Sequence, residues 1–328
     1  MKLKGKQVLV TGAGGFIGSH LTETLLEEGA KVRALVHYNS TGSWGMLEGN
    51  RHSNLAVIAG DVCDPYFCQT LVKGSEIVFH LAALIAIPYS YAAPQSYFQT
   101  NTLGTINLLQ AAREQKVARF IHTSTSEVYG TAQYVPIDEK HPLQGQSPYS
   151  ASKIAADKAA ESYFCSFGLP VTTVRPFNTY GPRQSARAFI PTVICQALSP
   201  KSRVVKLGSL KPVRDLTFVK DTAAGYLVAA IHPKLVGETV NLGVGKGYSI
   251  GEVARLIIKI IGTDKKIVVD QQRVRPGKSE VWRLVSNNQK MKTLTGWQPQ
   301  TNLKSGLQQT IRWVKDNLAQ YKSEIYNL

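Results

Sequence analysis

Short apolar runs alternate with longer segments of helical periodicity through the first half of the chain. The apolar runs, each a predicted β-strand, are Gln7–Thr11, Lys31–His37, Leu55–Ala59, Glu76–Leu81, Arg119–Ser124 and Val171–Arg175. The helical segments between them are Phe16–Glu28, Pro94–Gln115 and Tyr149–Phe167. This alternation is typical of βαβ units that build a parallel sheet. With right-handed crossovers it predicts an α/β fold with a doubly wound parallel sheet.

The amino-acid composition of the chain changes after Pro176, where Gly, Pro and basic residues become frequent. Only two brief strands are predicted there, Arg203–Leu207 and Thr239–Leu242. Near the end, Leu307, Ile311, Val314 and Leu318 form an apolar stripe on a helix predicted over 304–321.

These features predict a smaller mixed α/β domain behind the first. We place the first domain at residues 1–177 and the second at 178–328. Part of 215–235 is expected to return to the first domain.

Composition and charge narrow the class of protein. The 328 residues are 43% hydrophobic and 18% charged, which excludes a disordered or fibrous chain. The net charge of +16 is unevenly placed, because residues 1–150 hold 11 basic and 11 acidic side chains and the remainder hold 27 and 11. Such asymmetry indicates an anionic partner: nucleic acid, a membrane surface or a phosphate-bearing small molecule.

The sequence indicates neither a membrane protein nor a metal-binding protein. No run approaches ~18 apolar residues and the start lacks a signal-peptide core, so we expect a cytoplasmic protein without a membrane association. The four cysteines, at 63, 68, 165 and 195, lack metal-ligand spacing, so no metal site is expected.

A glycine-rich turn follows the first predicted strand and opens the first helix. Gly12, Gly15 and Gly18 carry the spacing G-x-x-G-x-x-G, with Phe16 and Ile17 at the start of the helix. Glycines permit a tight turn and a close backbone approach to a pyrophosphate, and the helix N-terminus attracts the anion. Strand, turn and helix coincide, so the segment predicts dinucleotide binding.

The second strand ends without the carboxylate that would bond an adenosine ribose. Residue 37 is His, and Val36-His37-Tyr38-Asn39-Ser40 offers neither an acid nor an Arg at the tip, which leaves NAD and NADP both open. Asp61 and Val62 follow the third strand and are expected to face the adenine. Asp61 could instead cap the helix that begins near Pro65.

A tyrosine and a lysine stand four residues apart at the start of a predicted helix. Tyr149 and Lys153 therefore share one face, and a neighbouring ammonium favours the phenolate form of a tyrosine. The alternative is a solvated surface pair. Thr125, at the end of a predicted strand, favours a catalytic site instead.

Five motifs together resemble the extended short-chain dehydrogenase/reductase family, whose first domain is a Rossmann fold. They are the glycine turn, His80-Leu81-Ala82-Ala83, Thr125-Ser126-Glu127-Val128-Tyr129-Gly130, Tyr149-x-x-x-Lys153, and Arg175-Pro176-Phe177-Asn178-x-Tyr180-Gly181-Pro182. Arg214-Asp215-Leu216-Thr217-Phe218-Val219-Lys220-Asp221 extends the match into the second half. The segment from Pro88 to Pro94 is most similar to bacterial UDP-N-acetylglucosamine 4,6-dehydratases of nonulosonic-acid synthesis.

The resemblance implies a cofactor that is regenerated in each turnover, NAD or NADP, which Leu81, Ala82 and Ala83 would also contact. Tyr149 would take the C4 hydroxyl proton of a sugar, with Thr125 and Lys153 assisting. Glu127 would take the C5 proton and water would leave from C6, giving a 4-keto-6-deoxy sugar.

The resemblance also leaves alternatives. Ser126 occupies a position where dTDP-glucose dehydratases carry an Asp that protonates the leaving hydroxyl, and Thr-Ser-Glu also occurs in GDP-mannose dehydratases and UDP-glucuronate decarboxylases. A 4-epimerase would not need Glu127. Residues 124–127 could also be a helix-capping box. A non-catalytic dinucleotide sensor is the alternative from another class, although such proteins typically lose the Tyr149 and Lys153 pair.

Substrate contacts follow from the same resemblance. It places Asn178 and Arg214 at the diphosphate, Arg187 nearby, Lys206 beside the nucleobase, Arg275 and Glu280 at the ribose, and Ser90 at the sugar. Each Arg could instead be a solvated surface residue. The partner is thus expected to be a nucleotide sugar, with a UDP-sugar as the leading expectation, and not nucleic acid. Helices 94–115 and 149–167 are expected to pair two copies as a homodimer.

Overall fold

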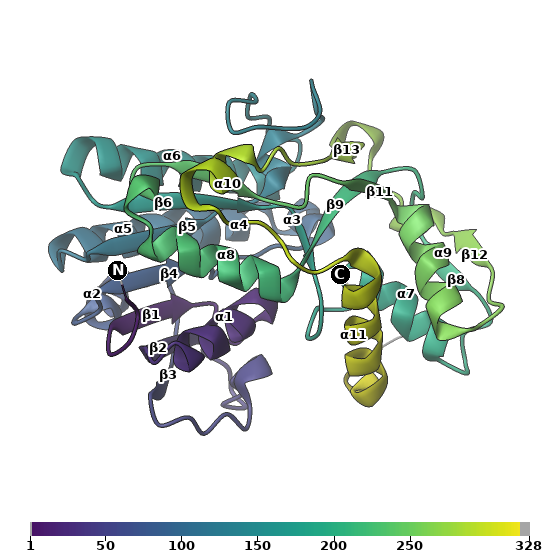
Figure 1. The fold of residues 1–328 in the computed structure, drawn as a ribbon, viewed down its shortest axis with the longest axis horizontal. Helices are drawn as coiled ribbons and strands as arrows, with labels where there is room; N and C mark the ends of the chain where they lie inside the picture. The colour runs from purple at the N-terminus through teal and green to yellow at the C-terminus, as the bar shows by residue number, and fades with distance from the viewer. Residues whose placement is uncertain (1, 322–328) are drawn as a thin grey trace.

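Seven parallel strands form the central sheet of the computed structural model, which describes residues 2–321 (Figure 1). The strands are β1 (Gln7–Thr11), β2 (Lys31–His37), β3 (Leu55–Gly60), β4 (Ile77–His80), β5 (Arg119–Thr123), β6 (Val171–Pro176) and β10 (Thr239–Leu242). Their order is β10-β6-β5-β4-β1-β2-β3, so the winding direction reverses between β1 and β4. Ligands of such sheets bind at the carboxyl ends of the strands beside this reversal. The predicted doubly wound fold is confirmed.

Helices cover both faces of this sheet. On one face lie α1 (Phe16–Glu27), α8 (Val219–Ile231) and α10 (Gln289–Thr295), and on the other lie α2 (Pro65–Val72), α5 (Gly104–Glu114) and α6 (Pro148–Phe167). Strand β1 shows why the sequence reads as a continuous apolar run. Val8 and Val10 join the core on the α1 side and Leu9 joins the core on the α6 side, since successive side chains point to opposite faces.

The predicted helix over 94–115 is interrupted. It consists of α4 (Pro94–Tyr97), a π-helical turn (Phe98–Leu103) and α5, and a short α3 (Ile87–Ala92) precedes it. Asn101 lies in the wide turn, fully buried, and its side chain bonds both the N–H and the carbonyl of Leu84, at 2.8 and 2.9 Å. The same side chain donates to Ser152 Oγ at 3.0 Å, so the turn ties the 84–87 segment to α6.

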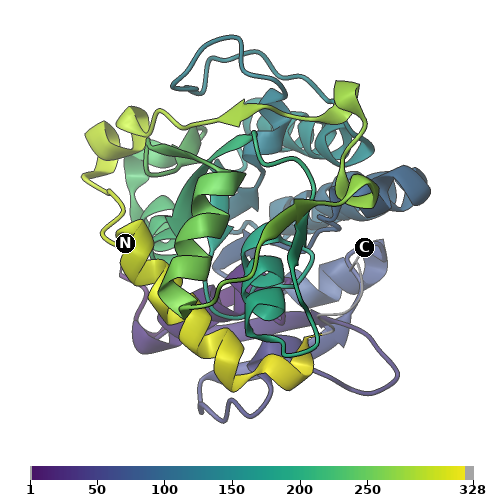
Figure 2. The ribbon, with the colours of Figure 1, turned by 90° about the vertical axis from the view of Figure 1, so that its right-hand side faces the viewer.

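A second lobe lies beyond the carboxyl ends of the strands, on the right in Figure 1, and faces the viewer in Figure 2. Its strands are β7 (Asn178–Tyr180), β8 (Val205–Leu207), β9 (Val213–Phe218), β11 (Gly247–Ser249), β12 (Ile267–Val269) and β13 (Arg283–Leu284), and its helices are α7 (Phe189–Leu198), α9 (Ile250–Ile261) and α11 (Leu303–Asp316). Strand β9 pairs with β7, β11 and β13, while β8 pairs with β12. Short 3-10 turns cover Gly45–Leu47, Ser126–Tyr129, Pro233–Leu235, Gln271–Arg273, Gly277–Ser279 and Leu318–Gln320.

The chain crosses between the lobes more often than the sequence indicates. Strand β10, predicted as a minor strand of the second domain, pairs in parallel with β6 as the edge of the large sheet, with Thr239 opposite Thr173. Helix α8 packs on α1, and α10 packs on β10. A four-residue strand carries too little pattern to show which sheet it joins.

The last helix is shorter than predicted. It ends at Asp316, with Leu307 and Val314 buried, and Leu318 lies in the following 3-10 turn. Among residues 2–321, no helix has the length and apolarity needed to cross a membrane.

Two lysines of the basic half have structural partners. Lys265 Nζ donates to the carbonyls of Gln196, Ala197 and Ser199 at 2.6 to 3.0 Å and so caps the C-terminus of α7. Lys290 Nζ bonds Glu238 and the Thr239 carbonyl, both at 2.7 Å, beside β10. Part of the positive charge therefore stabilises helix and strand ends.

Candidate active site

The glycine turn after β1 has no room for a side chain at Gly12 or at Gly18. Gly12 has a φ of +68°, and a Cβ there would lie 2.8 Å from the backbone nitrogen of Ala82. A Cβ on Gly18 would collide with the Gly12 carbonyl oxygen. Gly15 is exposed and is the N-cap of α1, whose first turn contains Phe16 and Ile17. A tight turn that leads to an open helix N-terminus fits the pyrophosphate of a dinucleotide.

Thr11 fixes the next segment beside this turn. Its Oγ1 accepts hydrogen bonds from the backbone N–H groups of Leu81 and Ala82, each at 3.1 Å, and lies 2.9 Å from His80 Nδ1. The other His80 ring nitrogen bonds Thr105 Oγ1 at 2.9 Å. Burial lowers the pKa of His80 well below its usual value, so the ring is neutral at pH 7. Residues 81–83 are thereby held against the glycine turn.

The adenosine side of the predicted site is open. His37 at the tip of β2 is exposed, and so is Asp61 after β3. Asp61 accepts only a local bond from Cys63 N, at 2.9 Å, whereas Asp64 caps α2 by accepting from Tyr66 N and Phe67 N. The capping alternative for Asp61 is therefore wrong. Val62 is buried, and a Cβ at Gly104 would lie only 2.7 Å from its Cγ2 atom.

Helix α6 presents Tyr149 and Lys153 on its buried face. Ser147 and Ser150 form a capping box that starts the helix, with Pro148 as its first residue. Lys153 Nζ donates to the Thr123 carbonyl at the end of β5, at 2.6 Å. Tyr149 and Lys153 are both buried, so the solvated-pair alternative is wrong.

Burial dominates the titration of both groups. It raises the pKa of Tyr149 above its usual value, against a hydrogen bond with Thr125 that lowers it. It lowers the pKa of Lys153 to about 8, against the Asp157 carboxylate that raises it. The contact that favours the Tyr149 phenolate here is thus Thr125, whereas the sequence pointed to Lys153.

Ser126 and Glu127 lie in the 3-10 turn after β5. Thr125 caps this turn by accepting from Glu127 N at 3.2 Å, and Ser124 donates to Asp157, so the predicted capping box over 124–127 does not form. Ser126 is buried and Glu127 is half-buried. Burial raises the pKa of Tyr149 and lowers the pKa of Arg214, and in both groups the negative charge of Glu127 acts to raise the pKa. Glu127 therefore lies close enough to Tyr149 and to Arg214 for its charge to act on both.

A cationic cluster gathers across from Glu127. Arg214 of β9 and Arg275 share the buried carboxylate of Glu280, at 3.5 and 3.7 Å. Two guanidinium groups on one carboxylate leave positive charge for an anion. Arg275 Nη1 and Asn178 Oδ1 are both buried without a hydrogen-bond partner. Buried polar atoms that still lack a hydrogen bond suit the polar ligand that the sequence predicted here.

The other predicted substrate residues differ in placement. Arg187, just before α7, is exposed, and its charge lowers the pKa of Tyr97 against the larger effect of burial. Tyr97 packs edge-on against Tyr149, with ring centroids 6.2 Å apart, so the residue that Arg187 influences borders Tyr149. Ser90 is fully buried, and its hydroxyl donates to the Ile87 carbonyl within α3 at 2.7 Å. The hydroxyl proton is therefore used inside the helix and is not free for the predicted sugar contact. Lys206 is exposed on β8.

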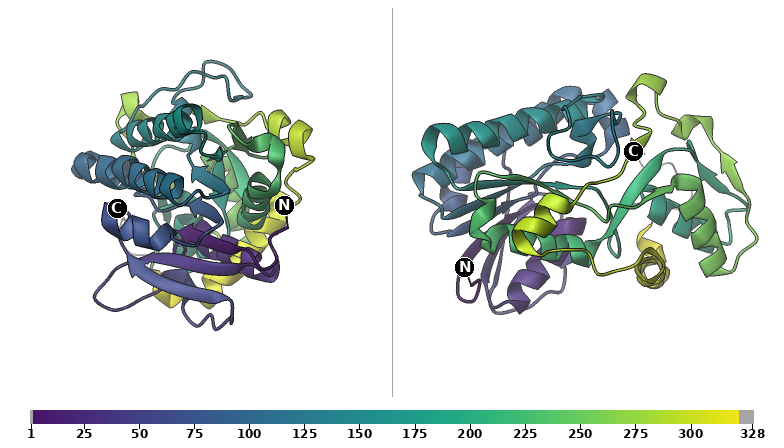
Figure 3. Two further views of the ribbon diagram at one scale, coloured as in Figure 1. Left: turned by 90° about the vertical axis from the view of Figure 1, so that its left-hand side faces the viewer. Right: turned by 45° about the horizontal axis from the view of Figure 1, so that its top comes forward.

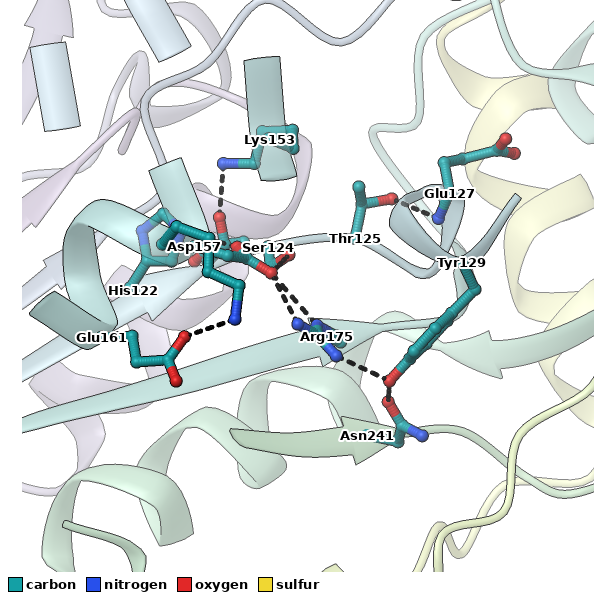
Figure 4. A network of polar contacts seen from close by, with 12 residues as sticks. His122, Ser124, Thr125, Glu127, Tyr129, Lys153, Asp157, Glu161, Arg175 and Asn241 are labelled. Carbon is teal, nitrogen blue, oxygen red and sulfur yellow. Dashed lines mark hydrogen bonds and ion pairs between the residues drawn. The ribbon is translucent and has the colours of Figure 1, made fainter. Parts of the chain in front are cut away.

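A buried network behind the site went unnoticed in the sequence (Figure 4). Asp157 accepts from Arg175 Nε and Nη2 at 3.1 and 2.9 Å, and Arg175 Nη1 donates to Tyr129 Oη at 3.1 Å. Tyr129 in turn donates to Asn241 Oδ1 of β10 at 2.7 Å. The available signal was the spacing of Tyr149, Lys153 and Asp157, four residues apart each time.

Asp215 is a second residue that the sequence did not reveal. Its buried carboxylate accepts from Val244 N, Gly245 N and both the N–H and hydroxyl of Ser286, at 2.6 to 3.1 Å. It thereby joins β9 to the segments that follow β10 and β13, and it fixes the backbone next to Arg214. In residues 2–321, no group of three or more His, Cys, Asp or Glu is arranged to hold a metal ion.

One cavity lies away from this site. It has a volume of about 510 Å³ on the flank of α6, between the β6 and β10 edge and residues 139–143. Its lining includes Ile154, Lys158 and Glu161 of α6 but none of Thr125, Glu127, Tyr149 or Lys153.

Known proteins share this fold and its length. The family model described as GDP-mannose 4,6 dehydratase matches residues 9–310. Human dTDP-D-glucose 4,6-dehydratase is 31% identical over 97% of this chain and 92% of its own.

Two solved structures are similar over nearly the whole chain. The dTDP-glucose 4,6-dehydratase DesIV of Streptomyces venezuelae, solved with NAD, has a TM-score of 0.86 at 28% identity and covers 96% of this chain and 99% of its own. UDP-glucuronic acid 4-epimerase of Bacillus cereus, solved with UDP-glucuronic acid and NAD, has a TM-score of 0.86 at 29% identity and covers 95% and 99%.

Fold, glycine turn and the Tyr149 and Lys153 pair define an extended short-chain dehydrogenase/reductase. Within that class, the chain belongs to the family of nucleotide-sugar dehydratases and epimerases.

Proposed function

We propose that the protein is an NAD-dependent nucleotide-sugar 4,6-dehydratase that acts on UDP-N-acetylglucosamine. The observation that carries dehydration is the placement of a carboxylate, Glu127, near both Tyr149 and the cationic cluster of Arg214. A sugar whose diphosphate binds Arg214 and whose C4 hydroxyl meets Tyr149 would present its ring to Glu127. Solved relatives contain NAD, which supports this cofactor. The choice of hexose rests on the resemblance of the segment from Pro88 to Pro94.

Each residue then has a distinct task. Tyr149 takes the C4 hydroxyl proton, and the Thr125 hydrogen bond favours the phenolate that this requires. Lys153, whose pKa is about 8, supplies a positive charge near the nicotinamide ribose below that pH. Bound NAD supplies the hydride acceptor for C4 and the donor for C6. Glu127 removes the C5 proton.

The proton for the departing C6 hydroxyl needs a second source. Ser126 is buried beside Glu127 and is a weak acid, so we assign the proton delivery to Glu127 itself. The proton removed from C5 is then delivered to the C6 oxygen, which leaves as water.

Three alternatives follow from the family. A 4-epimerase transfers hydride at C4 alone and would tolerate loss of Glu127. A UDP-glucuronate decarboxylase shares Thr125-Ser126-Glu127 and would release carbon dioxide. A non-catalytic dinucleotide sensor would keep cofactor binding without turnover.

Incubation with UDP-, dTDP- and GDP-sugars, followed by NMR of the products, tests the proposal. We expect a 4-keto-6-deoxy product from UDP-N-acetylglucosamine and no net change in nicotinamide absorbance. Tyr149→Phe should abolish turnover and retain NAD binding, whereas Tyr163→Phe, further along α6, should retain both. Carbon dioxide from UDP-glucuronate, or a C4 epimer as the product, would overturn the dehydratase assignment.

We also propose a homodimer through residues 94–115 and 149–167. Helices α5 and α6 lie side by side on one face of the sheet (Figure 3). Phe98, Leu103 and Phe167 of these segments are 41%, 53% and 48% exposed, so they offer apolar surface that such a pairing would bury. Sedimentation equilibrium should give twice the mass of one chain, and a monomer mass would exclude this pairing.

A further inference from the structure

Helix α6 meets the end of β5 at three successive turns. Tyr149 meets Thr125, Lys153 donates to the Thr123 carbonyl, and Asp157 bonds the side chains of His122 and Ser124. Asp157 Oδ1 accepts from His122 Nε2 at 3.1 Å, and Oδ2 accepts from Ser124 Oγ at 2.8 Å. Each of residues 122–125 therefore contacts one of these three α6 residues, and together these contacts fix the position of the helix along the strand.

Asp157 also balances the positive charge beneath the site. Its side chain is 4% exposed and that of Arg175, which bonds it twice, is 7% exposed. Burial would raise the pKa of Asp157, but hydrogen bonds and charges from His122 and Arg175 outweigh it and lower it to about 2. The carboxylate is therefore ionised at every pH at which an enzyme is assayed.

The charges around Lys153 come from four elements. Helix α6 contributes Tyr149 and Asp157, β4 contributes His80, β5 contributes His122, and β6 contributes Arg175. Burial lowers the pKa of both histidines, so these rings are neutral at pH 7. Of these groups, Asp157 is the one that raises the pKa of Lys153 against burial.

We infer that Asp157 is a positioning residue that keeps Lys153 charged and sets the register of α6 against β5. It acts through Lys153 and Arg175 and does not contact the sugar. This role rests on the proposed function of Lys153 in catalysis. It goes beyond that function because it assigns the charge of the catalytic lysine to a residue two turns beyond Tyr149.

The pH dependence of turnover tests this role. The Lys153 ammonium is present below its pKa of about 8 and lost above it, so activity should fall on the alkaline side there. In Asp157→Asn this limb should move to lower pH by about one unit, as for loss of a nearby opposite charge. Then kcat/KM should drop about fivefold more at pH 8 than at pH 6, since the charged fraction at pH 8 falls from about one half to about one tenth. Asp157→Glu keeps the charge and should restore the limb.

Two further variants separate charge from folding. Glu161→Gln removes the next carboxylate of α6, which is exposed and pairs with Lys158, and should leave the profile unchanged. Asp157→Asn combined with Arg175→Met removes both buried charges, so it should recover thermal stability while the alkaline limb stays displaced. The inference would be overturned if folded Asp157→Asn kept the alkaline limb of the unmodified protein. It would also be overturned if the double variant recovered that limb.

A measurement without substrate keeps this test separate from the proposed function. Calorimetric titration with NAD between pH 6 and 9 reports the Lys153 charge through cofactor affinity alone. We expect the affinity of Asp157→Asn to weaken at lower pH than that of the unmodified protein. Identical pH profiles for the two proteins would refute the role of Asp157 even if dehydration is observed. A displaced profile without dehydration would instead refute the proposed function.

Discussion

Replacing Glu127 by Gln separates the two halves of the proposed reaction. The cap of the 3-10 turn uses the backbone N–H of residue 127 and the Thr125 hydroxyl, so the substitution leaves the turn intact. A half-buried carboxylate replaced by an amide of equal size should change the free energy of unfolding by less than about 0.5 kcal/mol. Any large loss of activity then belongs to the chemistry and not to folding.

The expected loss follows from the task of the carboxylate. A positioned general base contributes about 10²- to 10⁴-fold to a rate, or roughly 3 to 5 kcal/mol of barrier. The C4 oxidation, in which Tyr149 would take the hydroxyl proton and bound NAD would accept the hydride, does not use Glu127 and should proceed. The reaction should therefore stop with a reduced nicotinamide and a 4-keto sugar on the protein.

Stopped-flow absorbance at 340 nm measures this arrest. The unmodified protein should show a brief transient, while Glu127→Gln should show a persistent rise of up to one equivalent per chain. Glu161→Gln, an exposed carboxylate of α6, is the matched control and should behave as the unmodified protein. Turnover of Glu127→Gln within threefold of the unmodified rate would refute the assigned base and favour a 4-epimerase.

Three further substitutions test other parts of the structure. Gly18→Ala should weaken NAD binding more than tenfold by calorimetry, because its Cβ would collide with the glycine turn, whereas Gly277→Ala, which meets nothing within 4 Å, should bind normally. Lys265→Met should lower the free energy of unfolding by about 1 to 3 kcal/mol in a denaturant titration, since three carbonyls lose their donor, and exposed Lys266→Met should not. His37→Asp should raise the ratio of NAD to NADP affinity at least about tenfold, because a carboxylate there bonds a ribose hydroxyl and repels a phosphate. An unchanged ratio would show that the tip of β2 does not contact the ribose.

Local spacing in the sequence determined much of the fold. The six strands of the first half lie where the apolar runs predict them, to within a residue at either end. A strand buried on both faces shows as an uninterrupted apolar run, and a tight turn shows as glycines at fixed intervals. The four-residue spacing of Tyr149 and Lys153 likewise places both on one helix face, whatever surrounds the helix.

Tertiary structure decided everything that depends on distant parts of the chain. Strand β10 joins β6 across more than sixty intervening positions, and Arg214 meets Glu280 across a separation of 66. Asp157 and Arg175 are each ordinary charged residues in the sequence, and only burial against one another makes them a network behind Lys153. The sequence shows which side chains are charged, but it does not show which residue each charged side chain will pair with. The sequence could therefore point to candidate reacting groups, while the packing of α6 against β5 and β6 sets the charge that surrounds them.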